Sequence, residues 1–169
     1  RWRHEIHQYP ETAYQETRTA DLVARELEQM GLEVHQGLAE TGVVGVLSAG
    51  RGNRAIGLRA DLDALNLQEL NHFEHRSLHD GKMHACGHDG HTAMLLGAAK
   101  HLSTDPGFDG TVFFIFQPAE EGGHGAKRMM DEGLFDAFPC ESVFGMHNMP
   151  GFEAGTFAVR KGPLMASAD

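Results

Sequence analysis

The first regular pattern along the chain is an alternation of apolar and charged residues with the spacing of an α-helix. Between residues 17 and 30 the apolar positions recur on one helical face, and Gly31 follows as a residue that commonly ends a helix. The pattern therefore predicts a helix with one face on a core. The apolar positions that set this spacing are Ala20, Val23, Leu27 and Met30.

Two further stretches are predicted to be helical. Residues 92–102 are apolar on most sides, so this helix is expected to be well buried, and Asp89 is placed to act as its N-cap. A shorter helix is expected from about residue 125 to residue 132, where Gly133 ends the pattern.

Short apolar runs indicate the β-strands. Residues 111–117 are apolar almost throughout, which is typical of a central strand covered on both faces, and Pro118 ends the run. The runs at 43–47 and 55–60 flank a cluster of Gly, Ser and Asn, which predicts a β-hairpin. Three more strands are expected, the first short and buried and the other two in a terminal hairpin: 142–146, 156–160 and 164–168.

Strands alternate with helices along the chain, and this order predicts an α/β sandwich with a largely parallel sheet. The length of 169 residues allows one domain with a real core. Because the chain starts at Arg1 rather than Met and stops at Asp169 without a tapering segment, we expect it to be part of a longer protein.

Charge and cysteine content narrow the classes of partner. A net charge of −10 argues against nucleic acid or an anionic membrane as a partner, and it is compatible with divalent cations. No stretch approaches the roughly 20 apolar residues of a membrane helix, and no leader-like segment opens the chain. Two cysteines, Cys86 and Cys140, make a poor disulfide framework. We expect a cytoplasmic protein in which Cys140 is a free, at least partly buried thiol, with a disulfide between the two as the less favoured alternative.

The densest group of metal-binding side chains lies in residues 83–91, which hold three histidines, one cysteine and one aspartate. Such a density in so short a run rarely arises from packing needs alone. The run precedes the helix predicted at 92–102, and the positive end of that helix would favour a thiolate at Cys86.

Other polar side chains follow the predicted strands. Because the carboxyl ends of parallel strands lie along one edge of a sheet, we expect these side chains to converge there with Cys86 and His88. The residues that follow the strands are Asp61, Asp63, Glu120, Glu121 and His147.

A mixture of thiolate, imidazole and carboxylate suits Zn²⁺, Mn²⁺, Co²⁺ or Ni²⁺ better than Mg²⁺ or Ca²⁺. The ligands spread over about sixty residues, which fits an open catalytic site better than a closed structural zinc site. Of the adjacent Glu120 and Glu121, one could bind metal while the other faces a substrate as general base. There are alternatives to this interpretation. The aspartates could be solvated loop residues, the Glu-Glu pair could be a solvated turn, and the metal site could be that of a structural zinc domain.

The remaining histidines of the first half of the chain are expected to lie at the surface or on the side of a helix rather than to bind metal. Residues 66–82 are polar and are predicted to form an exposed loop. The histidines concerned are His4, His7, His72, His75 and His79.

Three blocks of sequence resemble the signature motifs of the M20 metallopeptidase-related amidohydrolases. They are similar above all to the branch with hippurate hydrolase, N-acyl-amino-acid amidohydrolases and plant auxin-conjugate hydrolases. The blocks lie in the family's order at 83–92, 118–123 and 145–148, and residues 6–11 and 59–65 match as well. The resemblance covers the whole chain. It implies a zinc-peptidase-like catalytic domain, a three-layer sandwich with a mixed, largely parallel sheet.

By this resemblance the chain would hold a centre of two divalent metal ions, Mn, Zn, Co or Ni. Glu120 would be the catalytic base, and Asp63, with Asp61 beside it, would support the ligands from behind. The reaction would be hydrolysis of the amide bond of an N-acyl amino acid, such as hippurate or an N-acetyl amino acid. The implied ligands are Cys86, His88, Glu121 and His147.

Family members continue for about as long again, with a lid domain that carries dimer contacts and a further segment that supplies one more metal-binding histidine. We therefore expect residues 1–169 to be a partial catalytic domain whose lid is absent, and the full-length protein to be a homodimer through that lid. Alone, the chain is expected to bind metal weakly and to show little or no hydrolysis. The alternative is a truncated, non-catalytic domain that binds metal or a partner.

Overall fold

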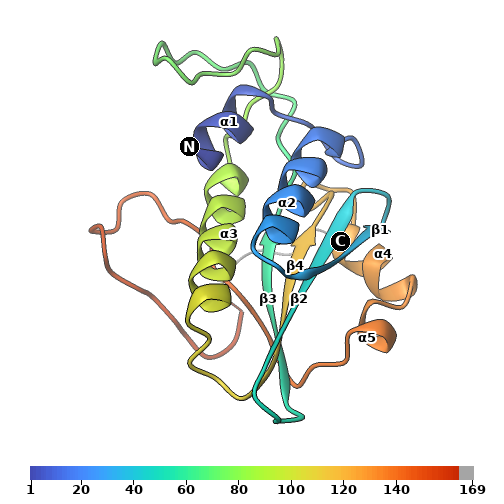
Figure 1. The fold of residues 1–169 in the computed structure, drawn as a ribbon. Helices are drawn as coiled ribbons and strands as arrows, with labels where there is room; N and C mark the ends of the chain where they lie inside the picture. The colour runs from blue at the N-terminus through green and yellow to red at the C-terminus, as the bar shows by residue number, and fades with distance from the viewer. Residues whose placement is uncertain (164–169) are drawn as a thin grey trace.

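The computed structural model describes residues 1–163, in which a five-stranded mixed sheet lies between two layers of helices (Figure 1). The strand order is β1-β2-β4-β3-β5. Strands β4, β3 and β5 run parallel to one another, and β2 and β1 continue the sheet antiparallel. The predicted α/β sandwich with a mixed sheet is confirmed. The strands are β1 (Glu33–Leu38), β2 (Gly42–Ala49), β3 (Ala55–Asp61), β4 (Gly110–Gln117) and β5 (Val143–Gly145).

Helices cover both faces of the sheet. Helices α2 and α3 pack on one face with α1 beside α3, and the shorter α4 and α5 pack on the other (Figure 1). The predicted helices at 17–30 and 125–132 are confirmed within one residue at either end. None of the helices in residues 1–163 combines the length and apolarity needed to cross a bilayer. The helices are α1 (Trp2–Gln8), α2 (Thr17–Gln29), α3 (His88–Thr104), α4 (Gly125–Asp131) and α5 (Leu134–Ala137).

Strand β4 is the centre of the core, as its uniformly apolar sequence predicts. Successive side chains of a strand point to opposite faces, so Phe114 and Phe116 enter the cluster under α2 and α3. Phe113 and Ile115 enter the second cluster, under α4 and α5. Burial of each such side chain stabilises the fold by about 1.5–3 kcal/mol, and the two clusters together fix the sheet between its helices.

The predicted hairpin of residues 43–47 and 55–60 is wrong. Both segments are strands, but β4 lies between them, with Val46 of β2 and Gly57 of β3 both opposite Phe113. The apolar β4 is buried on both faces and is hydrogen-bonded to a strand on either side. If β2 and β3 paired as a hairpin, β4 could not lie between them.

Several local predictions differ from the structure at the ends of the chain. Strand β5 is short as expected, but it is exposed rather than buried because it forms one edge of the sheet. Residues 156–160 form no strand among the described residues, and 164–168 lie outside them. The sequence pattern also missed α1 and β1, since both are short and rich in polar residues.

Helix α3 begins earlier than predicted, at His88, and Asp89 lies within its first turn rather than at the N-cap. The N-cap is Gly87, whose φ of +93° lies in the left-handed region that favours glycine. A Cβ at this position would also lie 2.4 Å from Oδ1 of Asn148. The glycine thus lets the chain turn sharply between Cys86 and His88.

Candidate metal centre

The site lies at one end of the sheet, at the carboxyl ends of its three parallel strands. Strands β3, β4 and β5 run in the same direction, so the segments that follow Asp61, Gln117 and Gly145 meet at this end. The N-terminal end of α3 packs against the same place and adds Cys86 and His88. The convergence expected from the order of strands is therefore present in the structure.

His88 is buried and presents one ring nitrogen to the site. Its Nδ1 lies 2.8 Å from the carbonyl oxygen of Asp63, to which an Nδ1–H donates, so that in the neutral ring Nε2 carries the lone pair. Among the described residues Nε2 has no hydrogen-bond partner. It faces oxygens of Asp61 at 3.6 Å and of Glu120 and Glu121 at 3.8 Å each. These separations exceed hydrogen-bond length and suit a cation held between imidazole and carboxylates.

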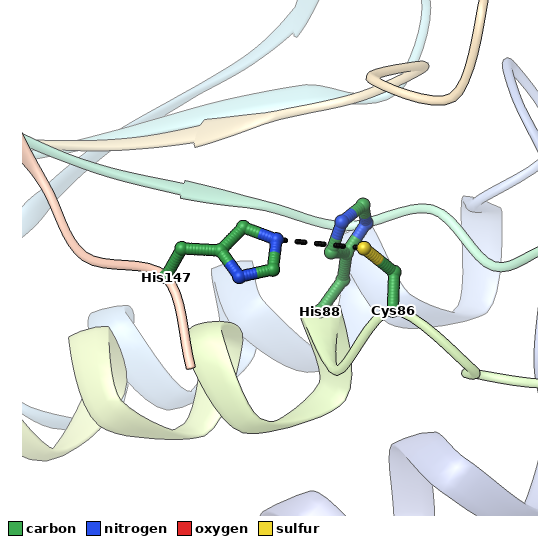
Figure 2. A group of neighbouring side chains, drawn as sticks. All are labelled: Cys86, His88 and His147. Carbon is green, nitrogen blue, oxygen red and sulfur yellow. Dashed lines mark hydrogen bonds between the residues drawn. The ribbon is translucent and has the colours of Figure 1, made fainter. Parts of the chain in front are cut away.

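Cys86 and His147 face each other beside His88, as Figure 2 shows. The Sγ atom of Cys86 lies 3.4 Å from Nε2 of His147. Nδ1–H of His147 donates to the carbonyl oxygen of Asn148 at 2.7 Å, which again leaves the lone pair on Nε2. The candidate ligand atoms of Cys86, His88 and His147 all lie within 4.8 Å of one another, so one ion could contact all three.

The expectation that the end of the helix favours a thiolate at Cys86 is wrong for the metal-free protein. Burial, a hydrogen bond with Glu121 and the negative charges of Glu121, Glu120 and Asp61 raise the pKa of Cys86 to about 12. Burial of the thiol, together with the carboxylates that folding brings to it, outweighs the partial charge of the helix end. A bound dication would reverse this balance, because a coordinating thiol is deprotonated.

Asp63 connects two of the candidate ligands from behind. Its Oδ1 lies 3.2 Å from Nδ1 of His88, and its Oδ2 accepts the backbone N–H of Glu121 at 2.8 Å. The aspartate is buried, so these contacts are shielded from water. Its carboxylate is placed to orient His88 and the Glu121 backbone together.

Asp61 stays ionised at the end of β3. Burial alone would raise its pKa, but a 2.6 Å hydrogen bond with His91 and the nearby charge of Arg59 hold the pKa of this carboxyl well below its usual range. His91 in turn contacts Asn148, whose backbone N–H lies 3.0 Å from its Nε2. His91 therefore flanks the site. The Asn148 contact has no sequence signal beyond its place after His147.

His84, the first histidine of the cluster, is buried with neither ring nitrogen hydrogen-bonded among the described residues. Burial lowers its pKa to about 4, so the ring is neutral. It belongs to the packing around the site rather than to the group of atoms that face His88.

One of the histidines expected at the surface or on a helix side is buried instead. His7 of α1 is 5% exposed and lies 2.9 Å from a carboxylate oxygen of Asp89 and 3.1 Å from one of Glu69. The hydrogen bond with Asp89 raises the pKa of His7 despite its burial. The pair Asp89 and Glu69 thereby joins α1 to the start of α3 and to the loop at 66–82. The cysteines agree with prediction, since Cys86 and Cys140 are both free and half-buried.

The donor set fits a divalent transition-metal ion. One buried imidazole nitrogen lacks a partner in the part of the chain that the structure describes. A second imidazole and a thiol lie beside it, and two adjacent carboxylates complete the group. The fold and this donor set define an α/β domain with a candidate metal centre at the carboxyl ends of its parallel strands.

Comparison with known proteins places this domain in a family. Residues 57–162 match peptidase family M20/M25/M40, and the chain belongs to that family. It is 50% identical over 167 residues to the hippurate hydrolase of Campylobacter jejuni, a match that covers 99% of this chain and 43% of the relative. It is 46% identical over 167 residues to the IAA-amino acid hydrolase ILR1-like 4 of Arabidopsis thaliana, covering 98% of this chain and 37% of the relative.

A solved structure supports the same family. The YXEP protein of Bacillus subtilis, described as a dinuclear metal binding peptidase from the M20 family, superposes with a TM-score of 0.91 at 39% identity. The match covers 96% of this chain and 46% of that protein. The chain thus spans less than half the length of the relatives it matches.

Proposed function

We propose that this chain is the metal-binding part of a catalytic domain that hydrolyses the amide bond of N-acyl amino acids, releasing the amino acid and a carboxylic acid. The observation that carries the proposal is the pairing of Glu120 and Glu121 next to Nε2 of His88, which has no hydrogen-bond partner within residues 1–163. The two relatives that are named hydrolases support it.

The four candidate ligands would hold two divalent ions, as in the dinuclear relative. Ions bound there would supply Lewis-acid chemistry, lowering the pKa of water and polarising an amide carbonyl. The donor set favours Mn²⁺, Zn²⁺, Co²⁺ or Ni²⁺. The proposed ligands are Cys86, His88, Glu121 and His147.

Glu120 is the proposed catalytic base. Its side chain is 43% exposed whereas that of Glu121 is 26% exposed, so Glu120 is the more open to water and substrate. Its carboxylate would accept a proton from the attacking water as the new C–O bond forms. It would then donate that proton to the leaving nitrogen as the C–N bond breaks.

Asp63 would serve this reaction without touching the substrate. Its carboxylate holds the His88 ring and the Glu121 backbone, which keeps two proposed ligands in place before a metal binds. Asp61 would act more remotely, through His91 and Asn148, on the segment that carries His147.

We further propose that the active protein is longer than this chain. The additional length would supply a lid domain with dimer contacts and substrate-binding groups, and one more metal-binding histidine. On this proposal the chain alone binds metal weakly and turns over N-acyl amino acids slowly or not at all. A cytoplasmic location stays a prediction.

The experiment compares the longer form with this chain in the hydrolysis of hippurate and a set of N-acetyl amino acids. Both proteins are stripped with a chelator and reloaded separately with Zn²⁺, Mn²⁺, Co²⁺ or Ni²⁺. We expect metal-dependent hydrolysis by the longer form. If that form binds metal and hydrolyses none of these amides with any of the four ions, the proposal is wrong and the chain belongs to a non-catalytic binding domain.

A further inference from the structure

The turn that carries Glu120 and Glu121 begins in an unusual backbone conformation. Ala119 has a φ of +52°, in the left-handed region that side chains other than glycine rarely adopt. The residue is fully buried, so its backbone N–H must find a partner within the protein. Such a conformation persists only where surrounding groups hold it in place.

The partner of that N–H is a buried carboxylate from the other end of the chain. Oε1 of Glu16 accepts the N–H of Ala119 at 2.9 Å, and Oε2 accepts the hydroxyl of Thr41 at 2.7 Å. Glu16 is 0% exposed and stands at the N-cap of α2. Burial raises the pKa of its carboxyl, whereas the hydrogen bonds from Thr41 and Ala119 and the helix dipole favour the ionised form. Both of its oxygens are thus occupied, and its hydrogen bonds reach none of the proposed metal ligands.

The remainder of the turn is held by other groups. Asp63 accepts the N–H of Glu121, and the N–H of Gly125 donates to the carbonyl oxygen of Ala119 at 3.0 Å. Gly125 has no room for a side chain, since a Cβ there would lie 1.7 Å from the carbonyl oxygen of Pro118. Glu120 therefore projects from a short segment fixed by Glu16 before it and by Asp63 after it.

We propose that Glu16 is a positioning residue for the reaction: its buried carboxylate holds Ala119 in the left-handed conformation that directs Glu120 and Glu121 into the site. The inference rests on the proposed function, because it gives Glu120 and Glu121 their roles. Without Glu16 the N–H of Ala119 is buried and unpaired. The turn then relaxes, and a displacement of about 1 Å at a reacting group can cost on the order of 100-fold in rate.

The test uses the longer form of the protein with three substitutions at one position. Glu16→Ala removes both acceptors, and Glu16→Asp is too short to reach both partners. Glu16→Gln keeps an oxygen for Ala119 and an amide N–H that can donate to Thr41. We expect Glu16→Ala and Glu16→Asp to lower kcat by at least tenfold with KM within about threefold, and Glu16→Gln to stay within about threefold of the parent.

The control is a glutamate that holds a different buried alanine, outside the turn of residues 118–123. Glu132 accepts the N–H of Ala39 at 2.6 Å, and Ala39 is also a buried alanine with a positive φ, +50°. Glu132→Ala is expected to lower stability and to leave kcat of the folded protein unchanged. If Glu16→Ala and Glu16→Asp behave like this control, or if Glu16→Gln loses as much as Glu16→Ala, the positioning role is wrong.

A second readout needs neither metal nor turnover. Hydrogen exchange of the Ala119 amide in the metal-free protein is expected to be at least tenfold faster in Glu16→Asp than in the parent or in Glu16→Gln. Equal exchange in all three would overturn the inference even if Glu16→Ala fails to fold. Failure of the proposed function gives a different result. If Glu120→Gln is active, the proposed catalytic base is wrong. If Glu120→Gln is inactive but Glu16→Ala is fully active, only the role of Glu16 is wrong.

Discussion

Replacement of Asp63 tests how the protein holds its candidate ligands before a metal binds. The carboxylate has two contacts, to Nδ1 of His88 at 3.2 Å and to the N–H of Glu121 at 2.8 Å. His88 keeps a second acceptor even in Asp63→Ala, because the backbone carbonyl of residue 63 lies 2.8 Å from the same nitrogen. The Glu121 N–H has no such second acceptor among the described residues. We therefore expect the substitution to weaken metal binding mainly through Glu121, whose backbone would no longer be held in place.

The size of the effect follows from these contacts. Removal of a group that orients a metal ligand typically costs 10–100-fold in metal affinity, which corresponds to about 1.4–2.7 kcal/mol. We expect Asp63→Asn to lie near tenfold, since its amide oxygen can still accept one N–H. Asp63→Ala should lie near 100-fold, since it loses both side-chain contacts.

Isothermal titration of the metal-free protein with Zn²⁺ measures these affinities, and thermal unfolding of the same samples shows how much protein is folded. Asp109→Asn is a matched control, because Asp109 accepts the backbone N–H groups of Arg51 and Gly52 at 2.6 Å each. This contact lies just before β4 begins, at the end of the sheet away from the site. Zn²⁺ affinity within twofold of the parent in Asp63→Ala, or an equal loss in Asp109→Asn, would refute the reasoning.

Two further predictions concern the start of α3. Gly87→Ala should lower the free energy of unfolding, measured in urea, by roughly 1–2 kcal/mol and should weaken Zn²⁺ binding. The reasons are that φ of residue 87 is +93° and that the new Cβ would meet Asn148. Unchanged Zn²⁺ binding would contradict this prediction. His7 has a raised pKa in the folded protein, so its contribution to stability is fully present below about pH 6.5 and is lost as pH rises through the folded pKa. The stability difference between the parent and His7→Gln should therefore shrink from pH 6 to pH 9, and a difference that grows over this range would be evidence against the Asp89 and Glu69 contacts.

The sequence was informative about the site because several of the proposed site residues follow strands whose direction could be inferred. Glu120, Glu121 and His147 come directly after apolar runs, and parallel strands bring such positions to one edge. The same apolar runs carry no information on which strand pairs with which. The hairpin of β2 and β3 was therefore predicted where β4 intervenes.

Properties that depend on distant contacts could not be predicted. The Cys86 thiol was expected to ionise from its place near a helix, but burial and carboxylates from two other segments raise its pKa. The hydrogen bond from Ala119 to Glu16 joins residues 103 positions apart, and neither the residue types nor their spacing predicts it. His7 likewise is buried by distant segments, the start of α3 and the loop at 66–82.

The measurement that tests the account most directly is hippurate hydrolysis by the metal-loaded longer form with Glu120→Gln, with metal content determined on the same sample. Glu28→Gln, an exposed change on α2, serves as the control. Because Glu120 is proposed to move the proton and not to bind metal, we predict parental metal content with turnover lowered by roughly 10²–10⁴-fold. Parental turnover in Glu120→Gln would contradict the central claim.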